Sequence, residues 1–170
     1  MKNQLRNFCL SAIIILLSIS VNAQNIKFSG QVFYKNNTLK DVKIELIDQD
    51  KKVVEELTKR NGKFKIKLEE DKIYFMKVTK EKFVSKVIMI SSFMKEEAKE
   101  KFEFDIELHK EREFRYVDAK LENKTVAHIF YNNKKLKFDW DRSLTQESKE
   151  EIAMLKELNK EKRNEKYSKF

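Results

Sequence analysis

Apolar and polar residues alternate with a period of two over much of the chain. Among residues 64–68, for example, Phe64, Ile66 and Leu68 alternate with lysines. A strand with one buried face shows this pattern, because successive side chains point to opposite sides of a sheet. Similar short segments recur about every ten residues. We therefore expect seven strands, at residues 26–34, 42–46, 53–58, 64–68, 73–79, 83–90 and 102–108.

The spacing of these strands predicts a mainly β fold. Nothing between them is long enough for the helix of a βαβ unit, so we expect a seven-strand antiparallel β-sandwich made of two sheets. Asn61-Gly62 lies between the third and fourth strands and tolerates positive φ, which predicts a tight hairpin there. Gly30, inside the first strand, indicates a bulge or a close approach of another backbone segment.

The pattern changes after residue 108. Residues 126–131 and 136–140 alternate on either side of Asn132-Asn133, which predicts a β-hairpin. Ser143 and Gln146 have the spacing of a capping box, so a helix is expected to start there and to end near Leu158. The charged residues beyond Leu158 are expected to fray. Residues 109–170 are thus a predicted hairpin–helix extension with a charged tail, beside a sandwich domain at 24–108.

Residues 1–23 have the pattern of a secretory signal peptide. A positive start precedes a charge-free apolar run at 8–19, and Ala23 completes a small-residue cleavage site. The alternative is an uncleaved membrane anchor, but a spanning helix needs about 20 apolar residues, more than this run contains. We expect a mature chain that begins at Gln24, has no transmembrane anchor after cleavage, and is periplasmic or associated with the outer membrane.

Three short motifs lie in register along the predicted strands: Gly-x-Val, Leu-x-x-Val and Thr-x-x-x-Gly-x-Phe. They are formed by Gly30 and Val32, by Leu39 and Val42, and by Thr58, Gly62 and Phe64. On these motifs, residues 26–108 resemble the carboxypeptidase regulatory-like domain, a transthyretin-like sandwich abundant in exported proteins of the Bacteroidota. The chain departs from that family at Lys59, where the family has Asp or Glu, and at Lys82-Phe83, where it has Gly-Tyr. The resemblance implies a structural or docking unit.

The charge of the chain argues against a nucleic-acid partner. The formal charge is +9, and 31 of the 37 basic residues are lysines, interleaved with 28 acidic residues. Arginine is the residue that forms forked contacts with phosphates and bases, so this composition indicates a solvated surface instead. The only cysteine, Cys9, lies within the predicted signal. The mature chain therefore has no disulfides, and its core must be held together by burial alone.

No catalytic constellation is evident. The chain has two histidines, His109 in a charged stretch and His128 inside a predicted strand, and a lone histidine in a strand is more often structural than catalytic. Asp139 and Asp141 are half of what a calcium site needs, and two such carboxylates before a helix are more often solvent-facing first-turn residues. No Cys-x-x-Cys, Gly-x-Ser-x-Gly or His-Glu-x-x-His motif occurs. We expect no enzyme activity, no cofactor and no metal.

The sequence favours an exported, non-enzymatic β-sandwich module that binds an envelope protein or scaffolds an assembly in the bacterial cell envelope. A carbohydrate-binding module and a small hydrolase with an unrecognised site are the alternatives. Tyr131 and Trp140 are the candidate partner-binding residues; otherwise these aromatics pack under the helix or against the sandwich. A row of exposed aromatic rings would favour a glycan ligand, whereas a free sheet edge or a covered aromatic patch would favour protein docking.

Overall fold

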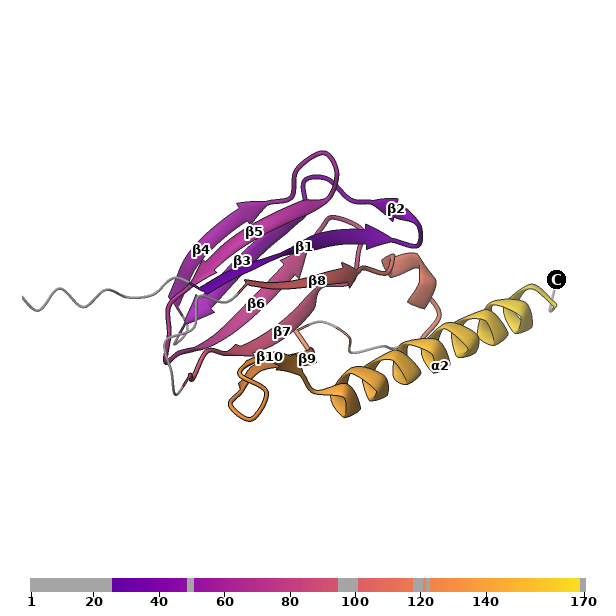
Figure 1. Cartoon of the computed structure of the whole chain (residues 1–170). Coiled ribbons are helices and arrows are strands. Elements are labelled where there is room, and N and C mark those ends of the chain that lie inside the picture. Colours follow the sequence, from indigo (N-terminus) through magenta and orange to yellow (C-terminus); the bar gives the residue numbers. More distant parts are fainter. Residues whose placement is uncertain (1–25, 49–50, 95–100, 118–120, 122, 169–170) are drawn as a thin grey trace, which may run out of the picture.

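The computed structural model describes residues 26–48, 51–94, 101–117, 121 and 123–168, so the predicted signal peptide lies outside the described residues. Two β-sheets pack against each other, and a long helix lies beside the second sheet (Figure 1). This confirms a mainly β fold. In chain order the elements are β1 (Ile26–Tyr34), β2 (Asn37–Thr38), β3 (Lys43–Asp48), β4 (Lys51–Leu57), β5 (Lys63–Leu68), β6 (Ile73–Thr79), β7 (Lys86–Ser91), β8 (Lys101–Glu107), η1 (Glu111–Phe114), β9 (Thr125–Asn132), β10 (Lys137–Trp140) and α2 (Arg142–Tyr167).

The two sheets differ in width. The first has four strands, with β1 pairing to β2, β5 and β8, and the second has six, in the order β10-β9-β7-β6-β3-β4. Strand β5 follows the expected alternation, because Phe64, Ile66 and Leu68 are buried while the lysines between them are exposed. The apolar faces of both sheets meet in one core, which confirms the sandwich.

The centre of the core is aromatic. Phe28 of β1 is fully buried, and its ring centroid lies 5.4 Å from that of Phe102, 6.1 Å from that of Phe104 and 5.0 Å from that of Phe138. Edge-to-face pairs of this kind contribute about 0.5–1.5 kcal/mol beyond the burial of apolar area. Because Phe138 belongs to β10, the C-terminal hairpin forms part of the main core.

The prediction that all strands run antiparallel is wrong at two places. Strand β8 pairs in parallel with β1, and β9 pairs in parallel with β7. Side-chain alternation does not encode strand direction, since a half-buried strand has the same period either way. The crossover from β7 to β9 runs through β8 and η1, which gives the length that a parallel connection needs. The hairpin of β9 and β10 therefore widens the second sheet instead of standing outside the sandwich.

The turn at Asn61-Gly62 has the predicted conformation but a different role. Gly62 has φ +73°, as expected. However, β4 and β5 belong to different sheets, so the turn carries the chain from one sheet to the other and the predicted hairpin is wrong. The N–H of Val32 donates to the carbonyl of Gly62 at 2.9 Å. A Cβ atom on Gly62 would lie 2.6 Å from the carbonyl oxygen of Val32, so the turn fits closely against β1.

Two further positions have a backbone explanation. A Cβ atom on Gly30 would collide with the carbonyl oxygen of Phe104 in β8, which confirms the predicted close approach. Lys82 has φ +67°, a left-handed conformation that glycine adopts at little cost. A lysine at this position therefore carries a conformational cost that glycine would not.

The C-terminal helix differs from its prediction at both ends. Asp141 is its N-cap and accepts a hydrogen bond from the N–H of Leu144 at 3.0 Å, whereas Ser143 was the expected cap. The helix then continues past Leu158 to Tyr167, through lysine, glutamate and arginine residues that favour helical backbone. No helix in the described part of the chain is long and apolar enough to cross a membrane.

Candidate binding groove

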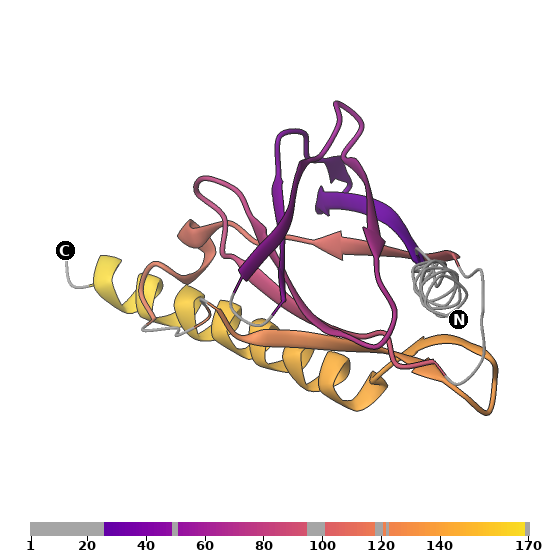
Figure 2. The ribbon, with the colours of Figure 1, turned by 90° about the vertical axis from the view of Figure 1, so that its left-hand side faces the viewer.

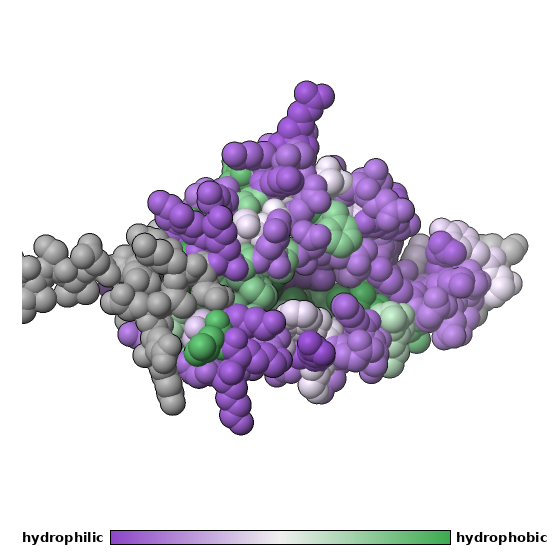
Figure 3. All heavy atoms as spheres, in the orientation of Figure 1, coloured by the Kyte–Doolittle hydropathy of each residue, from purple (hydrophilic) through white to green (hydrophobic). Residues whose placement is uncertain are grey.

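A groove of about 760 Å³ lies on one side of the sandwich, between β8 and α2. The first sheet ends at β8, and α2 packs along β9 of the second sheet (Figure 2). The inner face of β7 and β9 forms the floor, with Ile88, Ala127 and Ile129. In Figure 3, hydrophobic atoms are visible in the hollow between hydrophilic side chains. The site is thus an apolar trough with polar rims.

Strand β8 borders this groove with its edge. Six consecutive residues, 102–107, line the groove, although successive side chains of a strand point to opposite faces. In the described part of the chain, β8 pairs only with β1. Phe102 and Phe104 remain partly exposed although they pack against the core. The free edge of β8 therefore presents backbone donors and acceptors directly beside apolar surface.

Lys86 is the unusual residue of the floor. It starts β7, is mostly buried, and lies on the side of the strand that carries Ile88. Burial lowers the pKa of Lys86 to about 8; Glu107 opposes this shift, while Lys156 and Lys149 add to it. No carboxylate among the described residues is within ion-pair distance of its ammonium group. A mostly buried cation without an ion pair destabilises the fold, and groups of this kind are often found at binding sites.

The end of the groove near Lys86 is closed by a polar cluster. His109 is buried, and its Nδ1 lies 3.1 Å from Nζ of Lys156. Lys156 also forms an ion pair with Glu113 at 2.8 Å, and the hydroxyl of Tyr34 donates to Glu113 at 2.6 Å. Burial, together with the charges of Lys86 and Lys156, lowers the pKa of His109 to about 4. His109 is therefore neutral at pH 7, and the cluster ties α2 to η1 and β1.

The two candidate partner-binding residues have different environments. Tyr131 is 6% exposed and packs edge-to-face on Phe138, with ring centroids 5.3 Å apart. Trp140 is 44% exposed and lines the open end of the groove, where the guanidinium of Arg142 lies 5.3 Å from its ring centroid. The expected packing of these aromatics into the sandwich therefore applies to Tyr131, and only Trp140 is accessible at the groove. Whether either one binds a partner stays a prediction.

The carboxylates on either side of Trp140 have local structural roles. Asp139 is buried, forms an ion pair with Lys135 at 2.7 Å and accepts the N–H of Trp140 at 3.0 Å. The side-chain hydrogen bond from Lys135 is the main reason why the pKa of Asp139 is lowered. The expectation that both carboxylates face solvent is wrong for Asp139, while Asp141 caps α2. Within the described ranges, no group of three or more His, Cys, Asp or Glu residues could hold a metal ion.

A serine and a histidine do come together on the outer face of the second sheet. Oγ of Ser91 lies 2.9 Å from Nε2 of His128, and the ring of Phe130 packs beside the imidazole at 5.4 Å between centroids. A hydrolytic serine also needs an acid that orients the histidine and donors for the oxyanion. No hydrogen bond or ion pair joins a described carboxylate to His128. The pair thus lacks the remaining parts of such a site.

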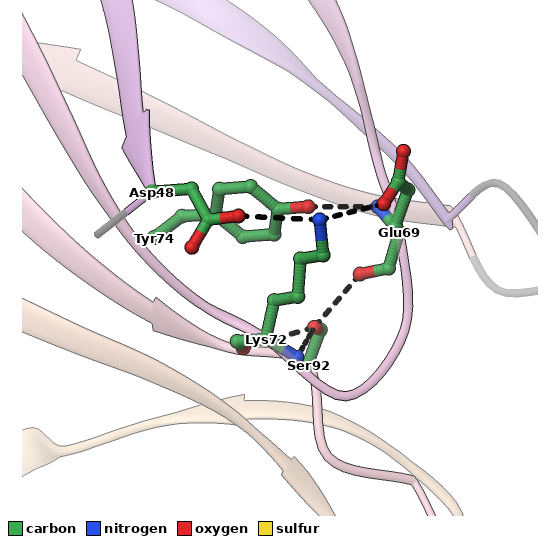
Figure 4. A network of polar contacts seen from close by, with 5 residues as sticks. All are labelled: Asp48, Glu69, Lys72, Tyr74 and Ser92. Atoms are coloured by element: carbon green, nitrogen blue, oxygen red, sulfur yellow. Dashed lines mark hydrogen bonds and ion pairs between the residues drawn. The ribbon is translucent and has the colours of Figure 1, made fainter. Parts of the chain in front are cut away.

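A second polar cluster lies away from the groove, at the turn between β5 and β6 (Figure 4). Nζ of Lys72 is 2.7 Å from Glu69 and 3.2 Å from Asp48. These two partners raise the pKa of Lys72. Ser92 donates to the carbonyl of Glu69 at 2.8 Å, and Tyr74 accepts the N–H of Glu69 at 3.2 Å. Every bond in this cluster holds one strand end to another, which is a structural role.

The exposed aromatic residues in the described part of the chain are Phe75, Phe93, Trp140 and Tyr167. Phe75 of β6 is 40% exposed and lies on the outer face of the second sheet, beside Ile47 and Met89 in the neighbouring strands. Trp140 is on the inner face, because its cross-strand partner is the core residue Ile129. Phe75 and Trp140 thus lie on opposite faces of the second sheet, whereas the free sheet edge that favours protein docking is present in β8.

Sequence reasoning missed the groove. Lys86 lies inside the strand predicted at residues 83–90, where the sequence does not distinguish it from a lysine on an exposed face. The one usable signal was the length of the chain after β7, which leaves enough residues to cover one side of the sandwich with new elements.

Comparison with known proteins finds only distant structural similarities. No family model and no curated protein matches the chain. A DUF3823 family protein from Parabacteroides merdae is 16% identical, over 52% of this chain and 48% of that one, with a TM-score of 0.40. 3-Chlorocatechol 1,2-dioxygenase from Rhodococcus opacus is 12% identical, over 54% of this chain and 62% of that one, with a TM-score of 0.41. Catechol 1,2-dioxygenase from Acinetobacter is 10% identical, over 64% of this chain and 58% of that one, with a TM-score of 0.41.

These similarities are distant. The matched region spans about half the length of the Parabacteroides protein. At these identities and TM-scores, the similarity is confined to a β-sandwich arrangement and says nothing about chemistry. Membership of the carboxypeptidase regulatory-like family stays a prediction.

Proposed function

We propose that this chain is a non-enzymatic binding module of the bacterial cell envelope, which holds an extended segment of a partner protein in the groove between β8 and α2. The observation that supports it is the free edge of β8 beside an apolar floor. A segment that adds to this edge gains backbone hydrogen bonds, while its alternate side chains enter the groove.

The lining of the groove fits a polypeptide. Its floor is apolar, whereas β8 contributes Glu103 and Asp105 to one wall and α2 contributes Lys149 and Lys156 to the other. A volume of about 760 Å³ is within the usual range for ligand sites. A strand edge with carboxylates on its outward face, opposite the ammonium groups of α2, suits a ligand that carries backbone dipoles and mixed side chains better than a purely apolar one. The envelope location comes from the predicted signal peptide, and its test is a mature N-terminus at Gln24.

A synthetic peptide tests strand binding. Acetyl-KFKIKL-amide has the sequence of residues 63–68, which already pair as a strand with β1. Trp140 is the single tryptophan of the chain and lines the groove, so its fluorescence reports binding. We expect saturable binding that weakens at least tenfold in Ala153→Phe, which fills the α2 wall.

Met154→Phe is the matched control. Met154 is the next residue of α2, is 64% exposed and does not line the groove, so this variant should bind like the original chain. If the peptide gives no saturable signal, or binds equally to the Ala153→Phe variant, the proposal is wrong.

The carbohydrate-binding alternative draws on one observation, the exposed ring of Trp140. Sugars stack on such rings, although Arg142 already lies over this one. Under this alternative, envelope polysaccharide binds the original chain and not Trp140→Ala, and Ala153→Phe has no effect on that binding.

A further inference from the structure

A row of carboxylates follows the outward face of β8. These side chains alternate with the residues that point to the core, and they sit on the strand whose edge borders the groove. Their direct cross-strand neighbours in β1 are a serine, a glutamine and a phenylalanine, while the one cation of β1, Lys27, pairs with Lys101 at the start of β8. Among the described residues the row forms no ion pair, and one member accepts the N–H of Gln31 at 3.1 Å. The row consists of Glu103, Asp105 and Glu107.

We propose that the segment bound along β8 alternates lysine or arginine with apolar residues. This inference rests on the proposed function. A strand paired with β8 places its outward side chains with Cβ atoms about 4.5–5.5 Å from those of the carboxylate row, a distance at which opposite charges attract. Its inward side chains lie over Ile88, Ala127 and Ile129. Cations on one face and apolar groups on the other therefore complement what β8 and the floor present.

The other charges of the groove lie farther from such a segment. A paired strand is about 4.8 Å from β8, so its nearest charges are the outward side chains of β8, namely the three carboxylates and Lys101 at the start of the strand. Lys149 and Lys156 lie on the opposite wall, and Lys156 is already paired with Glu113. Lys86 lies on the floor and faces the inward side chains near Glu107. We therefore expect basic residues only on the outward face of the bound segment.

The chain already contains this pattern in the same sheet. Strand β5 pairs with β1 on the side away from β8, with exposed Lys63, Lys65 and Lys67 and buried apolar residues between them. A basic–apolar strand is therefore compatible with this sheet. The alternative role for the carboxylates is to keep the free edge of β8 from pairing with any other strand.

Two peptides and a charge reversal separate these roles. The peptides are acetyl-KFKIKL-amide and acetyl-EFEIEL-amide, with Trp140 fluorescence as the readout. The variant is Glu103→Lys with Glu107→Lys, and Asp105 is kept because it bonds the backbone of β1. Glu161→Lys with Glu165→Lys changes the net charge equally at exposed positions near the end of α2.

We expect the original chain and the α2 control to prefer the lysine peptide about tenfold, and the β8 variant to prefer the glutamate peptide. High salt should shrink both preferences, since the charges are exposed. Equal binding of both peptides by the original chain overturns the inference and leaves strand binding intact. Failure of both peptides to bind overturns the proposed function as well. If the β8 variant does not fold, Glu103→Gln with Glu107→Gln should bring the two affinities together, and an unchanged preference would refute the inference.

Discussion

Replacement of Lys86 by methionine should stabilise the fold. Lys86 is the cation on the groove floor, beside Ile88, with no ion-pair partner among the described residues. Methionine has a similar length and no charge, so the change removes the cost of burying an ammonium group and adds apolar contact. Most substitutions of a mostly buried residue destabilise a protein. A gain in stability would show that Lys86 is kept for another reason, such as ligand binding.

The size of the gain follows from the pKa. Burial lowers the pKa of Lys86 from 10.5 to about 8, and each pKa unit is worth 1.36 kcal/mol. Because the folded pKa is the lower one, the penalty is complete below pH 8 and disappears above about pH 10.5. It amounts to about 3 kcal/mol at pH 7 and to roughly half of that at pH 9.5.

Urea unfolding of both chains at these two pH values measures the effect. We expect Lys86→Met to raise the free energy of unfolding at pH 7, and the difference from the original chain to shrink by about half at pH 9.5. Lys67→Met, on the exposed face of β5, is the matched control and should change little at either pH. A variant that is no more stable at pH 7, or a gain that does not depend on pH, would refute this explanation.

Three further outcomes are expected. Gly62→Val should lower the free energy of unfolding by about 2–4 kcal/mol, because valine is strained at φ +73° and its Cβ would approach the carbonyl of Val32; an unchanged thermal midpoint contradicts it. Lys82→Gly should raise the free energy of unfolding by about 0.5–1 kcal/mol, because glycine adopts the φ of +67° at this position at little cost. A lower urea midpoint contradicts this. The depressed pKa of His109 means that stability present above pH 6.5 is lost as pH falls toward 4. His109→Gln should remove that part of the loss, and an identical pH profile for both chains would rule it out.

Local features of this fold could be predicted from the sequence because they depend on neighbours in the chain. The alternation at Phe64, Ile66 and Leu68 identified β5, and the conformation of Gly62 followed from its residue type. Partners of strands could not be predicted in this way. Gln31 and Asp105 are 74 residues apart yet hydrogen-bonded, and nothing near either residue specifies that β8 lies parallel to β1. For the same reason, the turn at Asn61-Gly62 was predicted to close a hairpin, although it connects strands of two different sheets.

The candidate site was harder to predict because it arises from that long-range arrangement. Phe138 and Trp140 have the same period and share the inner face of β10. Phe138 is covered by Phe102 of β8, with ring centroids 6.0 Å apart, whereas Trp140 is left 44% exposed at the groove. Lys86 likewise became a buried cation only through the packing of α2 and β9 around it. The burial of these side chains depends on which distant elements pack over them, and the alternation of apolar and polar residues does not specify that packing.

Amide hydrogen exchange, followed by NMR with and without acetyl-KFKIKL-amide, tests most directly whether β8 accepts a strand. In a parallel pair, alternate N–H groups of a strand point away from its partner, so β1 leaves alternate amides of residues 102–107 free at the outer edge. We expect the peptide to slow the exchange of these alternate amides and to leave those of β5 and β10 unchanged. Slower exchange at β5 or β10 with none at β8, or no change at any strand, would contradict the groove beside β8 as the binding site.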